Sequence, residues 1–202
     1  MVGLAGALAL AYITLNTLST DAPGVRGLPA GARMPPFAVP LALSGLDGDA
    51  NVATKAGQGA AGRVPACSVR DPRVLNVCAL AARRPVVLAF AFDRAGKACA
   101  RQLDTLERVR RRHPGVAVAA VFVRGDRAAL RTEIRDRGWR FPVGYDRDGA
   151  VANLYGVGGC PTLTFAYPGR AVRATVTGTL GAAALDRRMG ALERAAAARR
   201  QP

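Results

Sequence analysis

The four cysteines of this chain, Cys67, Cys78, Cys99 and Cys160, are the residues best suited to chemistry. A thiolate attacks a disulfide to form a mixed disulfide, and a full exchange cycle needs a second thiol to resolve it. Cys160 lies in a Gly-rich turn and is followed by Pro161, which leads into an apolar, β-branched run to residue 166. Proline is tolerated at the first residue of a strand, so this run predicts a strand that begins at the Cys-Pro step.

The elements that would position Cys99 lie upstream. The apolar run at 86–92 predicts a buried strand, and residues 98–112 predict a helix. Cys99 shares one face of that helix with Leu103, Leu106 and Val109, at the spacing of an amphipathic helix.

Further along the chain, the pattern predicts a second buried strand at 116–123 and a charged helix at 127–137. A short edge-like strand at 141–143, a short helix after the turn at 148–149 and a hairpin of 162–166 with 171–177 follow. A closing helix covers 182–199, and 46–63 is expected to form a loop. This order predicts an α/β fold with a mixed central sheet and helices on both faces.

Several of these segments resemble the thioredoxin-like superfamily. They are the start at Met34-Pro35-Pro36-Phe37, the strand and helix at 85–106, and the run from 138 to 165 that ends in Tyr-Gly-Val-Gly-Gly-Cys-Pro-Thr-Leu-Thr-Phe. The resemblance is to the redoxin or alkyl hydroperoxide reductase–thiol-specific antioxidant type, and to membrane-anchored thiol-disulfide oxidoreductases. It covers about 34–192 and implies a thioredoxin-like fold, with a cis X-Pro bond beside the redox cysteines.

The family's Cys-x-x-Cys motif is incomplete here, because Gly96 stands at the attacking position and Cys99 at the second. In this fold the residue before the cis-proline lies against the active-site loop. The resemblance therefore implies a non-standard pair, Cys99 and Cys160, in a thiol-disulfide oxidoreductase.

The same resemblance implies that Pro161 shapes the substrate groove and that Thr162 belongs to the active-site loop. Gly96 and Lys97 would supply N–H groups at the helix start, where a thiol pKa is lowered.

Two alternatives remain for Cys99. A bridge to Cys160 would be purely structural in a redox-inert binding module of the same fold. Alternatively, Cys99 would be the peroxidatic thiol of a peroxiredoxin-like peroxidase, although Phe92 and Gly96 replace the Pro and Thr of that motif.

Cys67 and Cys78 are separated by ten residues with an Asp71-Pro72 turn between them. Closing a loop of that size stabilises a fold by about 2 to 3 kcal/mol in the chain-entropy model. We predict a structural disulfide, with the alternative that one of the two resolves Cys99.

The first 20 residues carry no charge and are mostly apolar, which predicts an N-terminal transmembrane anchor or, alternatively, a cleaved signal of a secreted protein. Residues 21–33, rich in Pro, Gly and Ala, predict a linker, and 34–196 the redoxin domain. Four cysteines beside such a segment favour the oxidising, extracytoplasmic side of the membrane.

The remaining features argue against other classes of function. The net charge is +15, but the arginines are scattered without interleaved aromatic residues, so nucleic-acid binding is not expected. The only histidine, His113, is expected to cap a helix or face solvent, and Asp146 and Asp148 to sit in turns. We expect no metal, no bound cofactor, and partners that are protein thiols or disulfides or an external electron donor.

Overall fold

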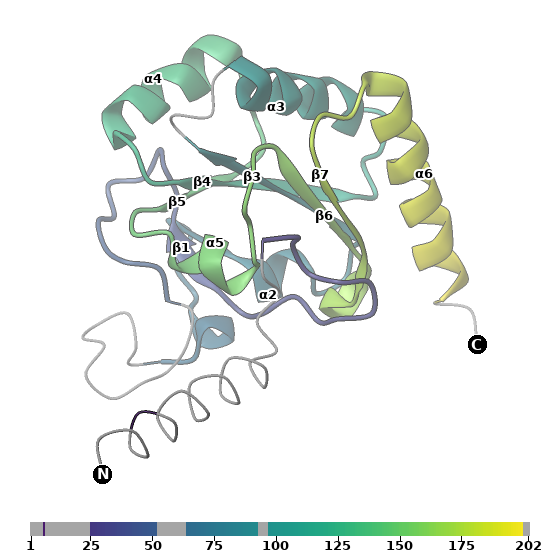
Figure 1. The fold of residues 1–202 in the computed structure, drawn as a ribbon, viewed down its shortest axis with the longest axis horizontal. Coiled ribbons are helices and arrows are strands. Elements are labelled where there is room, and N and C mark those ends of the chain that lie inside the picture. The colour runs from purple at the N-terminus through teal and green to yellow at the C-terminus, as the bar shows by residue number, and fades with distance from the viewer. Residues whose placement is uncertain (1–5, 7–24, 52–63, 93–96, 200–202) are drawn as a thin grey trace.

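The computed structural model describes Gly6 and residues 25–51, 64–92 and 97–199. Five strands form the central sheet in the order β5-β4-β3-β6-β7, in which β3, β4 and β5 are parallel and β6 and β7 antiparallel to their neighbours (Figure 1). The strands are β3 (Val86–Phe92), β4 (Ala117–Val123), β5 (Val143–Asp146), β6 (Thr162–Ala166) and β7 (Val172–Thr177). This confirms the predicted mixed sheet and the hairpin of β6 with β7.

The helices fall on the two faces of this sheet, with α3, α4 and α6 on one side and α2 and α5 on the other (Figure 1). Their bounds are α2 (Val77–Leu80), α3 (Lys97–Arg110), α4 (Arg127–Arg137), α5 (Ala150–Leu154) and α6 (Ala182–Ala198). Short 3-10 turns, η2 (Ala66–Ser68) and η3 (Pro168–Arg170), complete the helical elements of the described residues.

Successive side chains of β3 point to opposite faces of the sheet, so this strand contributes to both halves of the core. Val87 and Ala89 pack with α3 and α6 residues such as Leu103 and Met189. Leu88 and Phe90 point to the other face, where the fully buried Phe37 and Tyr155 lie, and the Phe90 and Tyr155 rings are 5.2 Å apart. A strand buried on both faces is apolar throughout, which is why 86–92 carries no polar residue.

A second, two-stranded sheet pairs β1 (Ala38–Pro40) with β2 (Val74–Asn76) in antiparallel register. It follows Met34 and Phe37, both fully buried, as expected for the Pro-Pro-Phe step that opens the domain. Leu41 bridges to Gly144, so this small sheet lies along β5 at the edge of the central sheet.

Strand β5 begins two residues later than the expected strand at 141–143. Pro142 has no N–H to give to a ladder, although its carbonyl accepts a hydrogen bond from the Ala120 amide at 3.0 Å. Phe141 instead contributes to the core beside Trp139.

The described part of the expected linker, from Val25 to Arg33, lies against the domain. Its backbone pairs with two distant segments: Arg26 bridges to Val157, and the Gly31 amide donates to the Val172 carbonyl at 2.9 Å. Leu28 is buried. Main-chain hydrogen bonds therefore extend the folded unit upstream of residue 34. Because such bonds do not depend on the type of side chain, no pattern in the sequence predicts them.

No helix within the described residues has the length and apolar character needed to span a membrane. The predicted anchor at 1–20 lies outside them except for Gly6, and so does 52–63 of the expected loop.

Candidate functional site

Cys99 is the third residue of α3, the helix that follows β3, and so lies at the N-terminal end of that helix. Its side chain is only 3% exposed and belongs to the core cluster with Leu103 and Leu106. Lys97, at the first position of the helix, is exposed, and Gly96 lies outside the described residues. The helix therefore presents Cys99 inward, near the end where the first N–H groups have no acceptor within the helix.

Cys160 lies at the start of β6, and its peptide bond to Pro161 is cis. Pro161 is buried, and its carbonyl accepts a hydrogen bond from the Gly178 amide at 2.8 Å. The Cys160 side chain is partly exposed and its Sγ lies 3.7 Å from the Phe90 carbonyl oxygen, at the end of β3. The Cys-Pro step thus lies beside the end of the strand that leads toward Cys99.

Thr162 is buried where β6 begins. Its Oγ1 donates to the Gly159 carbonyl at 2.7 Å, and the residue pairs with Phe90 on one side and Thr177 on the other. This side chain therefore fastens the turn that carries Cys160 to the sheet.

The Sγ atoms of Cys99 and Cys160 form a disulfide, with Cα atoms 5.7 Å apart and a sequence separation of 61. This bond joins the start of α3 to the turn before β6. The two residues differ in exposure: Cys99 is enclosed by the core, whereas Cys160 is partly exposed.

Gln102, one turn after Cys99, is a site neighbour for which the sequence analysis assigned no role. It is buried, and its Oε1 accepts a hydrogen bond from the Leu180 amide at 2.7 Å. This contact ties the Cys99 end of α3 to the segment between β7 and α6. Its Nε2 has no partner among the described residues. A polar residue on the apolar face of the helix was the signal that could have identified it.

Cys67 and Cys78 form the second disulfide, with Cα atoms 5.3 Å apart, as predicted. Asn76 organises this loop: its side-chain oxygen accepts from the Cys78 and Ala79 amides and its Nδ2 donates to the Ala66 carbonyl. Hydrogen bonds from Arg73 hold the pKa of Asp71 near 2. All four cysteines are therefore paired, and neither Cys67 nor Cys78 is free to resolve Cys99 in this state.

The expectation that His113 caps a helix or faces solvent is wrong. Its side chain is 12% exposed, and its ring nitrogens lie 3.0 Å from Asp186 and 3.2 Å from Glu193, both on α6. Hydrogen bonds from His113 and Arg112 lower the pKa of Asp186. The histidine thus braces the end of α3 against α6, through partners more than 70 residues away in sequence.

The two aspartates of the expected turn have different surroundings. Asp146 is fully buried at the end of β5 and accepts hydrogen bonds from the Val151 and Ala152 amides, so it caps α5. Burial raises its pKa in spite of these bonds. Asp148 is exposed. Within the described residues, no group of three or more His, Cys, Asp or Glu side chains is arranged to hold a metal.

No protein-family model matches the chain, and no curated protein matches its sequence. Solved structures do match. MTB DsbF, solved in mixed oxidised and reduced forms, has 25% identity and a TM-score of 0.54, over 59% of this chain and 87% of that one. A secreted Mycobacterium tuberculosis disulfide oxidoreductase homologous to E. coli DsbE has 21% identity and a TM-score of 0.53, over 58% and 88%.

A third structure, a Chlorobium tepidum protein provisionally assigned as the thiol:disulfide interchange protein DsbE, has 20% identity and a TM-score of 0.62. The match covers 82% of this chain and 98% of that one. The neighbours in structure are thioredoxin-like thiol-disulfide oxidoreductases, and this chain shares the thioredoxin-like fold with them.

Proposed function

We propose that this chain is a thiol-disulfide oxidoreductase that works through the Cys99–Cys160 disulfide. The observation that carries the proposal is the position of that bond, between the start of α3 and the residue that precedes cis-Pro161. Two of the neighbours in structure support it, since one is described as a disulfide oxidoreductase and another is provisionally assigned as a thiol:disulfide interchange protein.

The different exposure of the two residues supports a different role for each sulfur in this proposal. A substrate thiolate attacks Sγ of Cys160, the more accessible of the two, and the bond to Cys99 breaks. The electron pair leaves on Sγ of Cys99, near the N-terminus of α3.

A second substrate thiolate then attacks the substrate sulfur of the mixed disulfide and releases Cys160. The substrate now holds a disulfide, and the two electrons that it gave up reside in the thiols of Cys99 and Cys160. An external disulfide returns the pair to the oxidised state by the same exchange, and running the steps backwards reduces a substrate disulfide instead.

Other residues of the site position these atoms. Pro161 and Thr162 hold Cys160 in the turn before β6, through the Gly178 amide and the Gly159 carbonyl. Gly96 and Lys97 would complete the loop before Cys99, and the Lys97 amide belongs to the first turn of the helix. No bound cofactor enters this cycle.

The second candidate is a redox-inert binding module in which both disulfides are structural. The near-complete burial of Cys99 favours this alternative, because a sulfur enclosed in a core resists exchange.

We further propose an extracytoplasmic location, which two disulfides in one domain favour. In this proposal, residues 1–20 form a single-pass anchor or a cleaved signal. The described chain at Val25 lies against Gly158, two residues before Cys160, so the preceding segment joins the domain at its redox end.

The test is to equilibrate the protein in thiol–disulfide buffers of graded potential and map both disulfides by alkylation and mass spectrometry. Structural disulfides have potentials below about −300 mV, and catalytic ones are higher. We expect Cys99–Cys160 to open well before Cys67–Cys78. Opening of both bonds together below that value favours the inert module, and rapid sulfenylation of reduced Cys99 by peroxide favours the peroxidase.

A further inference from the structure

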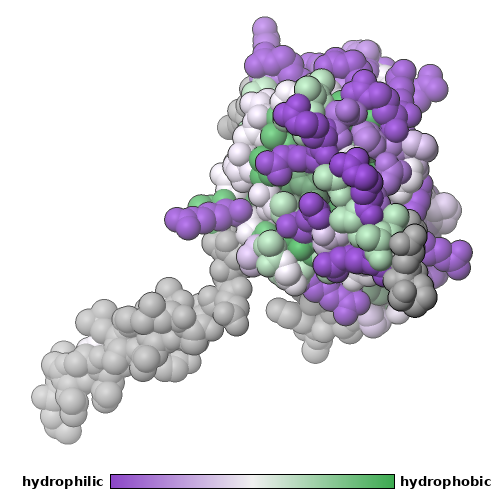
Figure 2. Space-filling model, turned by 90° about the vertical axis from the view of Figure 1, so that its right-hand side faces the viewer, coloured by the Kyte–Doolittle hydropathy of each residue, from purple (hydrophilic) through white to green (hydrophobic). Residues whose placement is uncertain are grey.

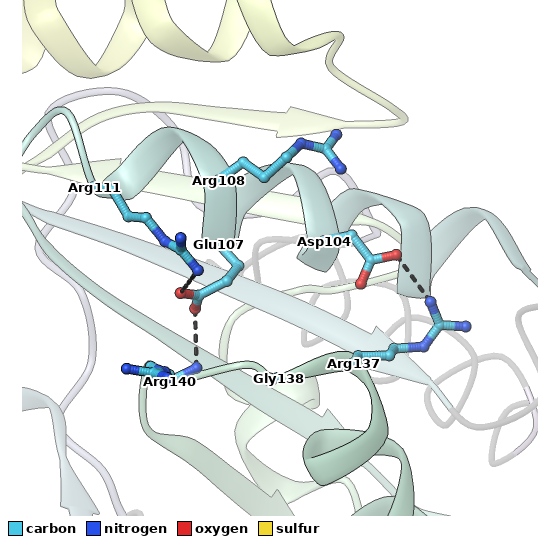
Figure 3. Close-up of a pocket in the computed structure, with 7 residues that line it drawn as sticks. All are labelled: Asp104, Glu107, Arg108, Arg111, Arg137, Gly138 and Arg140. Carbon is cyan, nitrogen blue, oxygen red and sulfur yellow. Dashed lines mark hydrogen bonds and ion pairs between the residues drawn. The ribbon is translucent and has the colours of Figure 1, made fainter.

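A recess of about 500 Å³ lies between α3 and the segment that connects α4 to β5 (Figure 3). It is lined by four arginines, two carboxylates and a glycine, namely Arg108, Arg111, Arg137, Arg140, Asp104, Glu107 and Gly138. The formal charge of this lining is +2. Figure 2 shows one face of the molecule, on which hydrophilic residues are spread over the surface with apolar patches between them.

The two carboxylates are used within the protein. Asp104 accepts from Trp139 Nε1 at 2.9 Å and from Arg137 at 2.8 Å. Glu107 accepts two hydrogen bonds from Arg110 and one from the Arg140 amide, each at 2.9 Å. Burial alone would raise the pKa of Glu107, but these hydrogen bonds and the nearby guanidinium charges hold it below its ordinary value. Through these hydrogen bonds, both side chains brace α3 against the connection.

Three guanidinium groups have N–H donors that remain available to a ligand. Arg111 is 66% exposed and 3.6 Å from Glu107, whose oxygens have closer donors. Arg108 donates to Thr105 Oγ1, and within the described residues no carboxylate pairs with it or with the Arg140 side chain. Figure 3 shows Arg108 and Arg111 projecting from α3, and Arg140 from the segment opposite.

We propose that this recess docks an acidic segment of a partner protein, with its carboxylates on Arg108, Arg111 and Arg140. A guanidinium offers a planar fork of donors that matches a carboxylate. The donors come from two elements around a concave surface, which fits discrete side chains better than a flat lipid surface.

The recess lies on the helix that carries Cys99. At 1.5 Å per residue, Asp104 and Arg108 lie about 8 and 14 Å beyond Cys99 along the helix axis. One interface of ordinary size, about 800 Å² on each partner, spans that distance. The identification of the occupant as a redox partner rests on the proposed function, whereas the binding itself does not.

The test measures binding of a fluorescent Asp/Glu-rich peptide to the full chain at low salt and at about 0.15 M salt. A peptide of the same length with Asn and Gln in place of the acids is the ligand control. The variant is Arg108→Gln/Arg140→Gln. The matched control is Arg187→Gln/Arg188→Gln, which removes two exposed charges from α6.

We expect the pocket variant to bind the acidic peptide about tenfold more weakly, a loss of about 1.4 kcal/mol, and the α6 variant to bind as the parent does. Equal loss in both variants would mean that only net charge matters, and would overturn the proposal. So would failure of the parent to prefer the acidic peptide, or binding to anionic vesicles that the peptide does not displace.

Exchange with a neutral small thiol is measured on the same proteins. It should be unchanged in the pocket variant, because neither substituted residue touches the disulfide. A parent protein that binds the acidic peptide but exchanges no disulfide would refute the proposed function and leave the docking surface standing.

Discussion

The two disulfides of this chain hold different kinds of structure. Cys67–Cys78 closes a short loop between cysteines that are 11 positions apart in sequence, and Asn76 also fixes the conformation of this loop. Cys99–Cys160 joins a helix start to a strand start 61 residues away, in a core where Cys99 packs with Leu103 and Leu106. The local bond supports a segment with little core of its own, whereas the long-range bond spans elements that the sheet already positions. In our proposal, it is the long-range bond that carries the chemistry.

Breaking the long-range pair should have the largest effect. Cys160→Ser removes the sulfur that we propose is attacked, so exchange with a dithiol peptide should fall to the uncatalysed rate. The double variant Cys67→Ser/Cys78→Ser should exchange at the parent rate at a temperature where it stays folded. Turnover assays on both proteins check this. Loss of exchange in the double variant, with exchange retained in Cys160→Ser, would contradict the proposal and place the chemistry at Cys67–Cys78.

For the local pair, we expect the main effect of substitution to be on stability and not on exchange. Cys67→Ala/Cys78→Ala should lose about 3 kcal/mol of unfolding free energy, since the open loop regains entropy in the unfolded chain. Urea denaturation of the oxidised proteins measures the loss. A loss under about 1 kcal/mol would show that Asn76 holds the loop without the bond.

Gln102 sharpens the comparison at the Cys99 end. Gln102→Ala leaves the Leu180 amide without its acceptor and opens a buried space, so we expect a loss of about 2 kcal/mol. Thr105→Ala, one position outside the buried face of α3, is the control and should stay within about 0.5 kcal/mol of the parent. Thermal unfolding of the two variants measures both losses. Equal stability of the two variants would show that the hydrogen bond of Gln102 to the Leu180 amide contributes nothing to the fold.

The smallest effect should be a dependence on pH. The pKa of Glu107 is lowered in the folded state, so its contribution is complete above its unfolded pKa of about 4.3 and is lost as pH falls through the folded value. Glu107→Gln should therefore cost about 1 kcal/mol at neutral pH and nothing measurable well below pH 4.

In the Cys67–Cys78 loop, Asp71 also has a lowered pKa, but it is solvent-exposed, so Asp71→Asn should change stability less than Glu107→Gln. Denaturation at several pH values checks both, and an equal effect of the two substitutions would contradict the difference in burial.

The sequence predicted most of the central sheet, because β3, β4 and β6 are apolar runs of strand length bounded by turn residues. It also predicted that Cys67 and Cys78 would pair, because short spacing around a turn is local information. The Cys99–Cys160 pair came from the resemblance to a known fold, since no local pattern reports a contact across 61 residues.

What the sequence did not reveal depends on distant partners or on the backbone. His113 lies between two α6 carboxylates that no local pattern connects to it. The segment from Val25 to Arg33 is held by main-chain hydrogen bonds, to which any residue except proline can donate, so its composition resembled a linker. Asp146 was expected in a turn, but burial gives it a second role as the cap of α5.

The most direct test of the account compares two single-thiol forms of the redox pair. Cys99→Ser leaves Cys160 as the thiol, and Cys160→Ser leaves Cys99, with Cys67–Cys78 intact in both. Each protein is mixed with glutathione disulfide, and mass spectrometry follows the formation of the mixed disulfide. The account predicts rapid capture at Cys160 and little at the buried Cys99. Faster capture at Cys99, or none at either residue, would contradict it.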